Sequence, residues 1–251
     1  GFGITYLAFD ETLEIRLAIK EYLPQEFALR SHLRASVASI EGRFREEIVP
    51  LTVKELIPGV GGSQTVEEFT FMEDEHLRAD CTIEQLSLLR PVFKDGGTVT
   101  AGNASPLSDG AAGVIVMERT LAEKKGLPPL LRFLGFAVAG VAPEIMGIGP
   151  VKAVPKILNR LGMSVNDIDI VELNEAFAAQ AIAVIRELEL PLDKVNVNGG
   201  AIALGHPLGC TGAKLTVQLL HEIRRRQDRY GLVTMCIGGG QGAAGVFERL
   251  N

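Results

Sequence analysis

The sequence is poor in cysteine, contains no long apolar run and carries no excess of positive charge. Its three cysteines recur at no short spacing, which argues against a disulfide framework and a zinc cluster. No apolar run reaches the roughly 18 residues of a membrane-spanning helix, and residues 1–30 lack a signal-peptide layout. A net charge of −6 argues against a nucleic-acid-binding surface. We therefore expect a cytoplasmic protein with no metal, no membrane segment and no nucleic-acid partner.

The second half of the chain has the alternating rhythm of an α/β protein, and it follows a linker at 124–129. Strand patterns cover 130–138, 168–173, 195–197, 232–237 and 244–248, and helical patterns cover 149–161, 177–188 and 211–225. The first half is less regular. It is predicted to hold a helix over 25–40 that Gly42 ends, an edge strand at 48–53, exposed loops at 57–65 and 67–75, a short helix at 82–89 and a buried strand at 111–118.

The first 23 residues read as two strands and carry two further motifs. These are Gly1-Phe2-Gly3-Ile4-Thr5-Tyr6 and Leu17-Ala18-Ile19-Lys20-Glu21-Tyr22-Leu23-Pro24. They resemble the glycine-rich loop and the third-strand lysine of bacterial serine/threonine protein kinases, in which Lys20 would contact ATP phosphates. No His-Arg-Asp or Asp-Phe-Gly motif follows. Kinase activity is therefore not expected, and an edge hairpin with a solvated Lys20 is the favoured interpretation.

Three polar residues fall where a strand or a glycine turn ends: Asn174, His206 and Cys236. Open α/β sheets place ligand sites at such positions. Each residue also has a structural interpretation, since Asn174 would suit a helix cap, Cys236 a small core side chain and His206 a buried, hydrogen-bonded imidazole. Taken one at a time, these residues leave both interpretations open.

Longer motifs surround these residues. They are Asn174-Glu175-Ala176-Phe177, Gly205-His206-Pro207-Leu208-Gly209 and Cys236-Ile237-Gly238-Gly239-Gly240-Gln241-Gly242. Together they resemble the thiolase family, the acetyl-CoA and 3-ketoacyl-CoA C-acyltransferases, in register from about residue 26 to the end. The resemblance implies an α/β fold made of a thiolase-like C-terminal half, a mixed five-stranded sheet with helices on both faces, plus the thiolase loop region, and the fold is expected to be incomplete. The implied domains are a kinase-like hairpin at 1–25, a loop domain at 26–106, a remnant of the N-terminal domain at 107–129 and a C-terminal domain at 130–251.

The resemblance also implies roles for individual residues. Cys236 matches the acid/base cysteine, and His206 matches the histidine that activates the nucleophilic cysteine and binds the thioester oxygen. Asn174 matches the residue that holds a water in the first oxyanion hole, and the Gly238 amide matches a donor of the second. Coenzyme A and acyl-CoA are then substrates, with no permanently bound cofactor. Their implied contacts are Arg78, Phe93, Ala101, Ser105, Met146 and Phe177.

One departure from the family bears on activity. Thiolases carry the acyl-accepting cysteine in their N-terminal half, and neither Cys81 nor Cys210 matches it. Without a nucleophile no acyl-enzyme forms by the ping-pong route. We therefore expect a truncated or chimeric chain in which thiolytic cleavage of 3-ketoacyl-CoA, or the reverse Claisen condensation of acetyl-CoA, is impaired. A non-catalytic coenzyme-A-binding remnant is the alternative. The ending at 245–250 is typical of degradative, β-oxidation members, and the family forms homo-oligomers, although the oligomeric state of this chain stays open.

Overall fold

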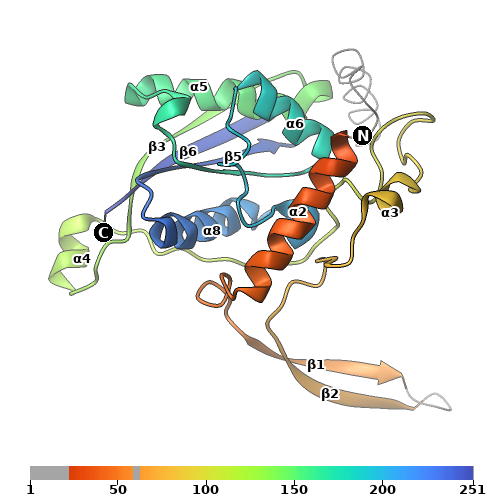
Figure 1. Ribbon diagram of the computed structural model, residues 1–251. Helices are drawn as coiled ribbons and strands as arrows, with labels where there is room; N and C mark the ends of the chain where they lie inside the picture. The colour runs from red at the N-terminus through yellow and green to blue at the C-terminus, as the bar shows by residue number, and fades with distance from the viewer. Residues whose placement is uncertain (1–22, 59–62, 251) are drawn as a thin grey trace.

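The computed structural model describes residues 23–58 and 63–250, and a mixed four-stranded sheet lies at its centre (Figure 1). Its strands run in the order β3 (Leu131–Gly140), β6 (Gln241–Arg249), β5 (Tyr230–Ile237) and β4 (Ile170–Leu173). β6 is antiparallel to both of its neighbours, whereas β4 is parallel to β5. All four strands coincide with predicted strand patterns, because each pattern is an apolar run with clear ends.

Helices cover both faces of this sheet, as expected. α5 (Gly149–Leu161) and α6 (Ala178–Glu187) lie over one face and α8 (Thr211–Arg226) lies over the other (Figure 1). Successive residues of β4 pack against the helices on opposite faces of the sheet, because side chains alternate along a strand. Ile170 packs with Leu215 and Leu219 of α8, whereas Val171 belongs to the core on the opposite face.

The predicted fifth strand at 195–197 is reduced to one parallel bridge between Val195 and Val171. Asn196 has a φ of +48°, which turns the chain away after that single pairing. Its side chain then makes the hydrogen bonds to Leu173 that a paired strand would make. Oδ1 accepts from the Leu173 N–H and Nδ2 donates to the Leu173 carbonyl, both at 2.8 Å. The five-stranded expectation is therefore corrected to four strands within the described residues.

The helix predicted over 25–40 is α2 (Leu23–Ile40), which lies beside α6 and the short α7 (Ala201–Leu204) (Figure 1). Buried Ala35 and Ala38 let it approach Ala203 closely. Gly42 ends the helix with a φ of +70°, as predicted. Residues 23–25 belong to this helix, and the remainder of the kinase-like hairpin lies outside the described residues.

A two-stranded hairpin projects from the body of the molecule (Figure 1). It pairs β1 (Leu51–Pro58) with β2 (Gln64–Phe71) in antiparallel register. This corrects two expectations, because the first strand lies later than 48–53 and β2 replaces a predicted loop. β2 is exposed along its whole length, so no buried face imposes the alternation by which a strand is detected.

The buried strand predicted at 111–118 does not form. Ile115 and Val116 are 89% and 83% exposed. No strand lies beside this segment in the described part of the chain, so its backbone has no ladder to join. The flanking helix α4 (Arg119–Lys124) was not predicted, and the Glu118 side chain caps it. The short helix α3 (Ile83–Ser87) lies within the predicted 82–89 and is capped by Thr82.

Glu47, in the turn after α2, leads us to expect that the stability of the chain depends on pH. Burial raises the pKa of Glu47 from 4.5 to about 7, with Lys214 opposing the shift and Asp74 and Glu222 adding to it. The folded state therefore binds more protons than the unfolded state between these two pH values, and stability falls as the pH rises through them. We expect Glu47→Gln to raise the free energy of unfolding by at most about 3 kcal/mol at pH ~8 and by little at pH ~4.

Denaturant titration at both pH values measures this difference. Glu84→Gln is the control, since Glu84 is an exposed side chain on α3 and should leave the pH dependence unchanged. Equal pH dependence in Glu47→Gln and the unsubstituted chain would contradict the assignment.

Candidate active site

Two of the predicted catalytic residues meet at the carboxyl edge of the parallel strand pair. Asn174 directly follows β4, and Cys236 is the next-to-last residue of β5. The Asn174 N–H donates to the Thr234 carbonyl at 3.0 Å, two residues before Cys236. This hydrogen bond fixes the chain after β4 against β5. The strand order thus brings Asn174 and Cys236 to one edge, where α/β folds bind ligands.

His206 reaches the same edge from the turn after α7. Its Nε2 lies 3.4 Å from Nδ2 of Asn174, and its Nδ1 lies 2.6 Å from Oγ1 of Thr211. The preceding Gly205 has a φ of +88°, and a Cβ there would lie 2.6 Å from the Ser108 hydroxyl oxygen. Glycine is therefore required at this turn. The same Ser108 hydroxyl accepts the His206 N–H at 3.2 Å.

Both candidate proton carriers are neutral near pH 7. Burial lowers the pKa of His206, and Lys214 lowers it further. Cys236 keeps some solvent contact, yet its dense surroundings raise the pKa of the thiol to about 11. A thiol with that pKa holds its proton at neutral pH and can give it to a stronger base. The edge therefore contains a proton donor and a neutral imidazole.

The helix-cap interpretation of Asn174 does not fit the structure. α6 begins at Ala178, and its N-cap is Phe177. Asn174 is fully buried, and its Oδ1 has no hydrogen-bond partner. Buried polar atoms are nearly always paired, so an unpaired one beside a histidine suits a bound water or ligand. This geometry favours the functional interpretation of Asn174.

Gly238 begins the turn between β5 and β6 and is exposed. The next two glycines have φ values of +87° and +93°. A Cβ on Gly240 would lie 2.4 Å from the Val141 carbonyl oxygen, so only glycine fits there. The turn is thereby held in place, with the Gly238 backbone at the same end of β5 as Cys236.

Sequence reasoning missed the group that supports the Asn174 loop, which is the carboxylate of Glu175. This side chain is 1% exposed and accepts from the Ser31 hydroxyl at 2.7 Å, the Asn196 amide at 2.8 Å and the Ile202 N–H at 3.3 Å. A charged residue inside the first thiolase-like motif was the only available signal. Its partners come from three distant segments, so their convergence is a property of the folded chain.

Some of the residues predicted to contact coenzyme A also lie close together. The rings of Phe93 and Phe177 meet edge to face with centroids 6.1 Å apart. Ser105 donates its N–H to the Ala176 carbonyl at 3.0 Å, which places it beside Phe177. Met146 lies in the 3₁₀ helix η2 (Pro143–Ile148), which packs on α6 through Ile148. Ala101 lies in an exposed turn.

Arg78 is held by other partners. Its backbone N–H donates to Nδ1 of His32 at 3.2 Å, and its guanidinium donates to the Glu75 carbonyl at 3.3 Å. The guanidinium group is exposed, as a contact to a charged ligand requires.

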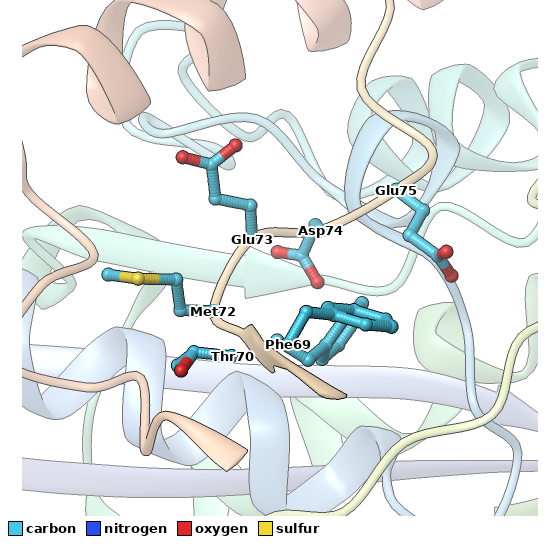
Figure 2. A pocket seen from close by; sticks show the side chains of 7 residues that line it. Phe69, Thr70, Met72, Glu73, Asp74 and Glu75 are labelled. Atoms are coloured by element: carbon cyan, nitrogen blue, oxygen red, sulfur yellow. The ribbon is translucent and has the colours of Figure 1, made fainter. Parts of the chain in front are cut away.

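A hollow of about 430 Å³ lies elsewhere, against the consecutive residues 69–75 at the base of β2 (Figure 2). None of the predicted site residues lines it. Three of its lining residues, Glu73, Asp74 and Glu75, carry carboxyl groups (Figure 2), which is unfavourable for an anionic ligand such as coenzyme A. Among the described residues, no helix could span a membrane and no three acidic, histidine or cysteine side chains gather as metal ligands.

Comparison with known proteins gives consistent matches along nearly the whole chain. The thiolase N-terminal domain model matches residues 10–120, and the thiolase C-terminal domain model matches residues 127–249. The 3-ketoacyl-CoA thiolase of Bacillus subtilis is 57% identical over 247 residues, covering 97% of this chain and 63% of that protein. The chain thus spans less than two thirds of the length of this relative.

Solved structures agree with this result. The Bacillus anthracis acetyl-CoA acetyltransferase superposes with a TM-score of 0.90 at 47% identity, covering 99% of this chain and 60% of that one. Human mitochondrial 3-ketoacyl-CoA thiolase in complex with CoA gives 0.84 at 40% identity, covering 98% and 59%. The N-terminal family model begins inside the segment that resembles a kinase, and that resemblance stays a prediction. The two family models, the fold and the site edge agree: the chain belongs to the thiolase family.

Proposed function

We propose that this chain carries the acid/base half of a thiolase centre, acting in thiolytic cleavage of 3-ketoacyl-CoA or in the reverse condensation of acetyl-CoA. The observation that carries the proposal is the meeting of Asn174 and His206, 3.4 Å apart, at the strand edge that holds Cys236. Coenzyme A and acyl-CoA are the proposed substrates, and no cofactor stays bound. A role in fatty-acid β-oxidation is supported by the ending at 245–250, which resembles that of degradative members.

In the cleavage direction, a cysteine from outside this sequence gives its thiol proton to Nε2 of His206 and attacks the 3-keto carbon. It takes that proton back when it leaves as the acyl group passes to coenzyme A. The bond between C2 and C3 breaks, and its electron pair forms the enolate of acetyl-CoA. Cys236 gives its thiol proton to C2, which suits a pKa of about 11, and becomes a thiolate. The Cys236 thiolate takes the proton of the coenzyme A thiol as that sulfur attacks the acyl-enzyme. The Gly238 amide and the protonated His206 donate hydrogen bonds to the developing oxyanions.

Neither of the other cysteines matches the acyl-accepting cysteine of the family. Cys81 packs against the main core, and burial together with Asp80 raises the pKa of its thiol. Cys210 is the N-cap residue of α8. We therefore expect the chain by itself to give no thiolysis of 3-ketoacyl-CoA, measured by the loss of substrate absorbance beside a full-length thiolase. Turnover by the chain alone would contradict this expectation.

A non-catalytic coenzyme-A-binding remnant is the second candidate, favoured by the raised pKa values of Cys236 and Cys81, which leave little thiolate near neutral pH. A fusion separates the two candidates. The Bacillus subtilis thiolase up to the residue that aligns with position 22 is joined to residues 23–250 of this chain, so that no aligned segment is lost. An active fusion supports the catalytic proposal, and a folded fusion that binds coenzyme A without turnover supports the remnant.

The aromatic pair predicts an effect on binding. If Phe93 and Phe177 flank the pantetheine chain, Phe93→Ala should weaken coenzyme A binding about fivefold to tenfold, as expected for an aromatic contact worth about 1 kcal/mol. Calorimetric titration of the chain with coenzyme A measures the change. Phe133→Ala is the matched control, because Phe133 makes a comparable ring contact with Phe247 on the exposed side of β3. Equal losses in both variants would count against the assignment.

A further inference from the structure

The Thr211 hydroxyl contacts Nδ1 of His206, the ring nitrogen that faces away from the site edge. Thr211 is the first residue of α8 and is 1% exposed. Its Oγ1 lies 2.6 Å from Nδ1 of His206 and donates to the Pro207 carbonyl at 2.9 Å. Both contacts are within hydrogen-bonding distance, and both lie within the turn that leads into the helix.

Counting donors fixes the direction of the bond to the imidazole. A threonine hydroxyl has one proton and two lone pairs, and a carbonyl can only accept. In the structure the single proton goes to the Pro207 carbonyl, which also accepts the Cys210 and Thr211 N–H groups. With its proton used there, the hydroxyl oxygen accepts from His206. Nδ1 consequently carries a hydrogen. In the neutral ring, Nε2 is then left with its lone pair.

The surroundings of Nε2, on the other side of the ring, are consistent with a hydrogen on Nδ1. Nδ2 of Asn174 lies 3.4 Å from Nε2 and can donate to its lone pair, whereas Asn174 Oδ1 has no partner. Burial and Lys214 both lower the pKa of His206, which keeps the ring neutral at pH ~7. Only the neutral ring has a tautomer to select.

We propose that Thr211 is a positioning residue that holds His206 in the tautomer with hydrogen on Nδ1, so that the Nε2 lone pair faces the site edge. The functional meaning of this arrangement rests on the proposed function, in which His206 handles a proton. Thr211 itself touches no reacting atom. Selection of a histidine tautomer by a hydrogen bond to its far nitrogen is a recurrent device in active sites.

The test compares Thr211→Val, which keeps the shape and removes the hydroxyl, with Thr211→Ser, which keeps the hydroxyl. The control is Thr216→Val, because Thr216 makes the same kind of bond to a carbonyl four residues earlier, Gly212, at 2.8 Å, but meets no histidine. The readout is nitrogen NMR of the full chain with isotope-labelled histidine. A His206→Asn chain identifies the His206 signals among those of the four histidines.

We expect the unsubstituted chain, Thr211→Ser and Thr216→Val to show the hydrogen on Nδ1. Thr211→Val should shift the His206 signals toward the tautomer with hydrogen on Nε2, while the other histidines keep theirs. A hydrogen on Nε2 in the unsubstituted chain, or equal shifts in the two valine variants, would overturn the proposal. The measurement needs no turnover, so its failure is distinct from a failure of the proposed function.

Discussion

Replacing Cys236 by serine in the fusion with the Bacillus subtilis portion is expected to lower kcat by on the order of 1,000-fold, within the range found for loss of a general acid or base. The substitution keeps the shape of the side chain and removes the acidity. A serine hydroxyl gives up its proton far less readily than a thiol, even one whose pKa burial raises to about 11. The enolate of acetyl-CoA then has no adjacent proton donor.

The expected loss is in kcat rather than in KM, because Cys236 acts on the reacting carbon and not on the remote parts of coenzyme A. Cys81→Ser is the control. Cys81 packs at the edge of the core, and its replacement should change kcat less than twofold. A Cys236→Ser fusion as active as the parent would remove the acid/base assignment.

The second large effect concerns the carboxylate of Glu175. We expect Glu175→Gln to lower the free energy of unfolding by about 3 kcal/mol, since a buried donor left without its acceptor costs roughly 1–3 kcal/mol. One carboxylate oxygen accepts from Ser31 and Ile202, and the other accepts from Asn196. An amide offers one oxygen in place of two, so either orientation sets an NH₂ group against a donor.

Glu172 provides a matched control three residues earlier in the same buried segment. It is also 1% exposed, but its Oε2 has no partner, and burial raises its pKa well above the usual range. At pH ~8 Glu172→Gln removes the cost of charging this group and should leave stability unchanged or higher. Denaturant titration of both variants measures the contrast. Equal destabilisation would show that burial alone, and not the satisfied hydrogen bonds, decides the outcome.

The sequence predicted the elements whose apolar residues follow a regular pattern. The strands β3 to β6 and the helices α5, α6 and α8 each carry an apolar pattern of the right period, so their positions follow from local residues. The site edge followed as well, because Asn174 and Cys236 fall where apolar runs stop. These predictions needed no knowledge of which segments meet.

The failures share one physical cause, which is a dependence on partners distant in sequence. The apolar run at 111–118 forms no strand, and no strand of the described residues pairs with it. The strand expected at 195–197 is replaced by the side chain of Asn196, whose two hydrogen bonds to Leu173 cannot be read from the pattern. Glu175 acts through contacts with Ser31, Asn196 and Ile202, which exist only after these distant segments have packed together.

The most direct test of the central claim is the thiolysis rate of the fusion compared with that of the chain alone. If the edge formed by Asn174, His206 and Cys236 is the acid/base half of a thiolase centre, the fusion should cleave 3-ketoacyl-CoA. The chain alone and a His206→Asn fusion should not. A folded fusion that binds coenzyme A but gives no turnover, or a His206→Asn fusion with full activity, would contradict the account.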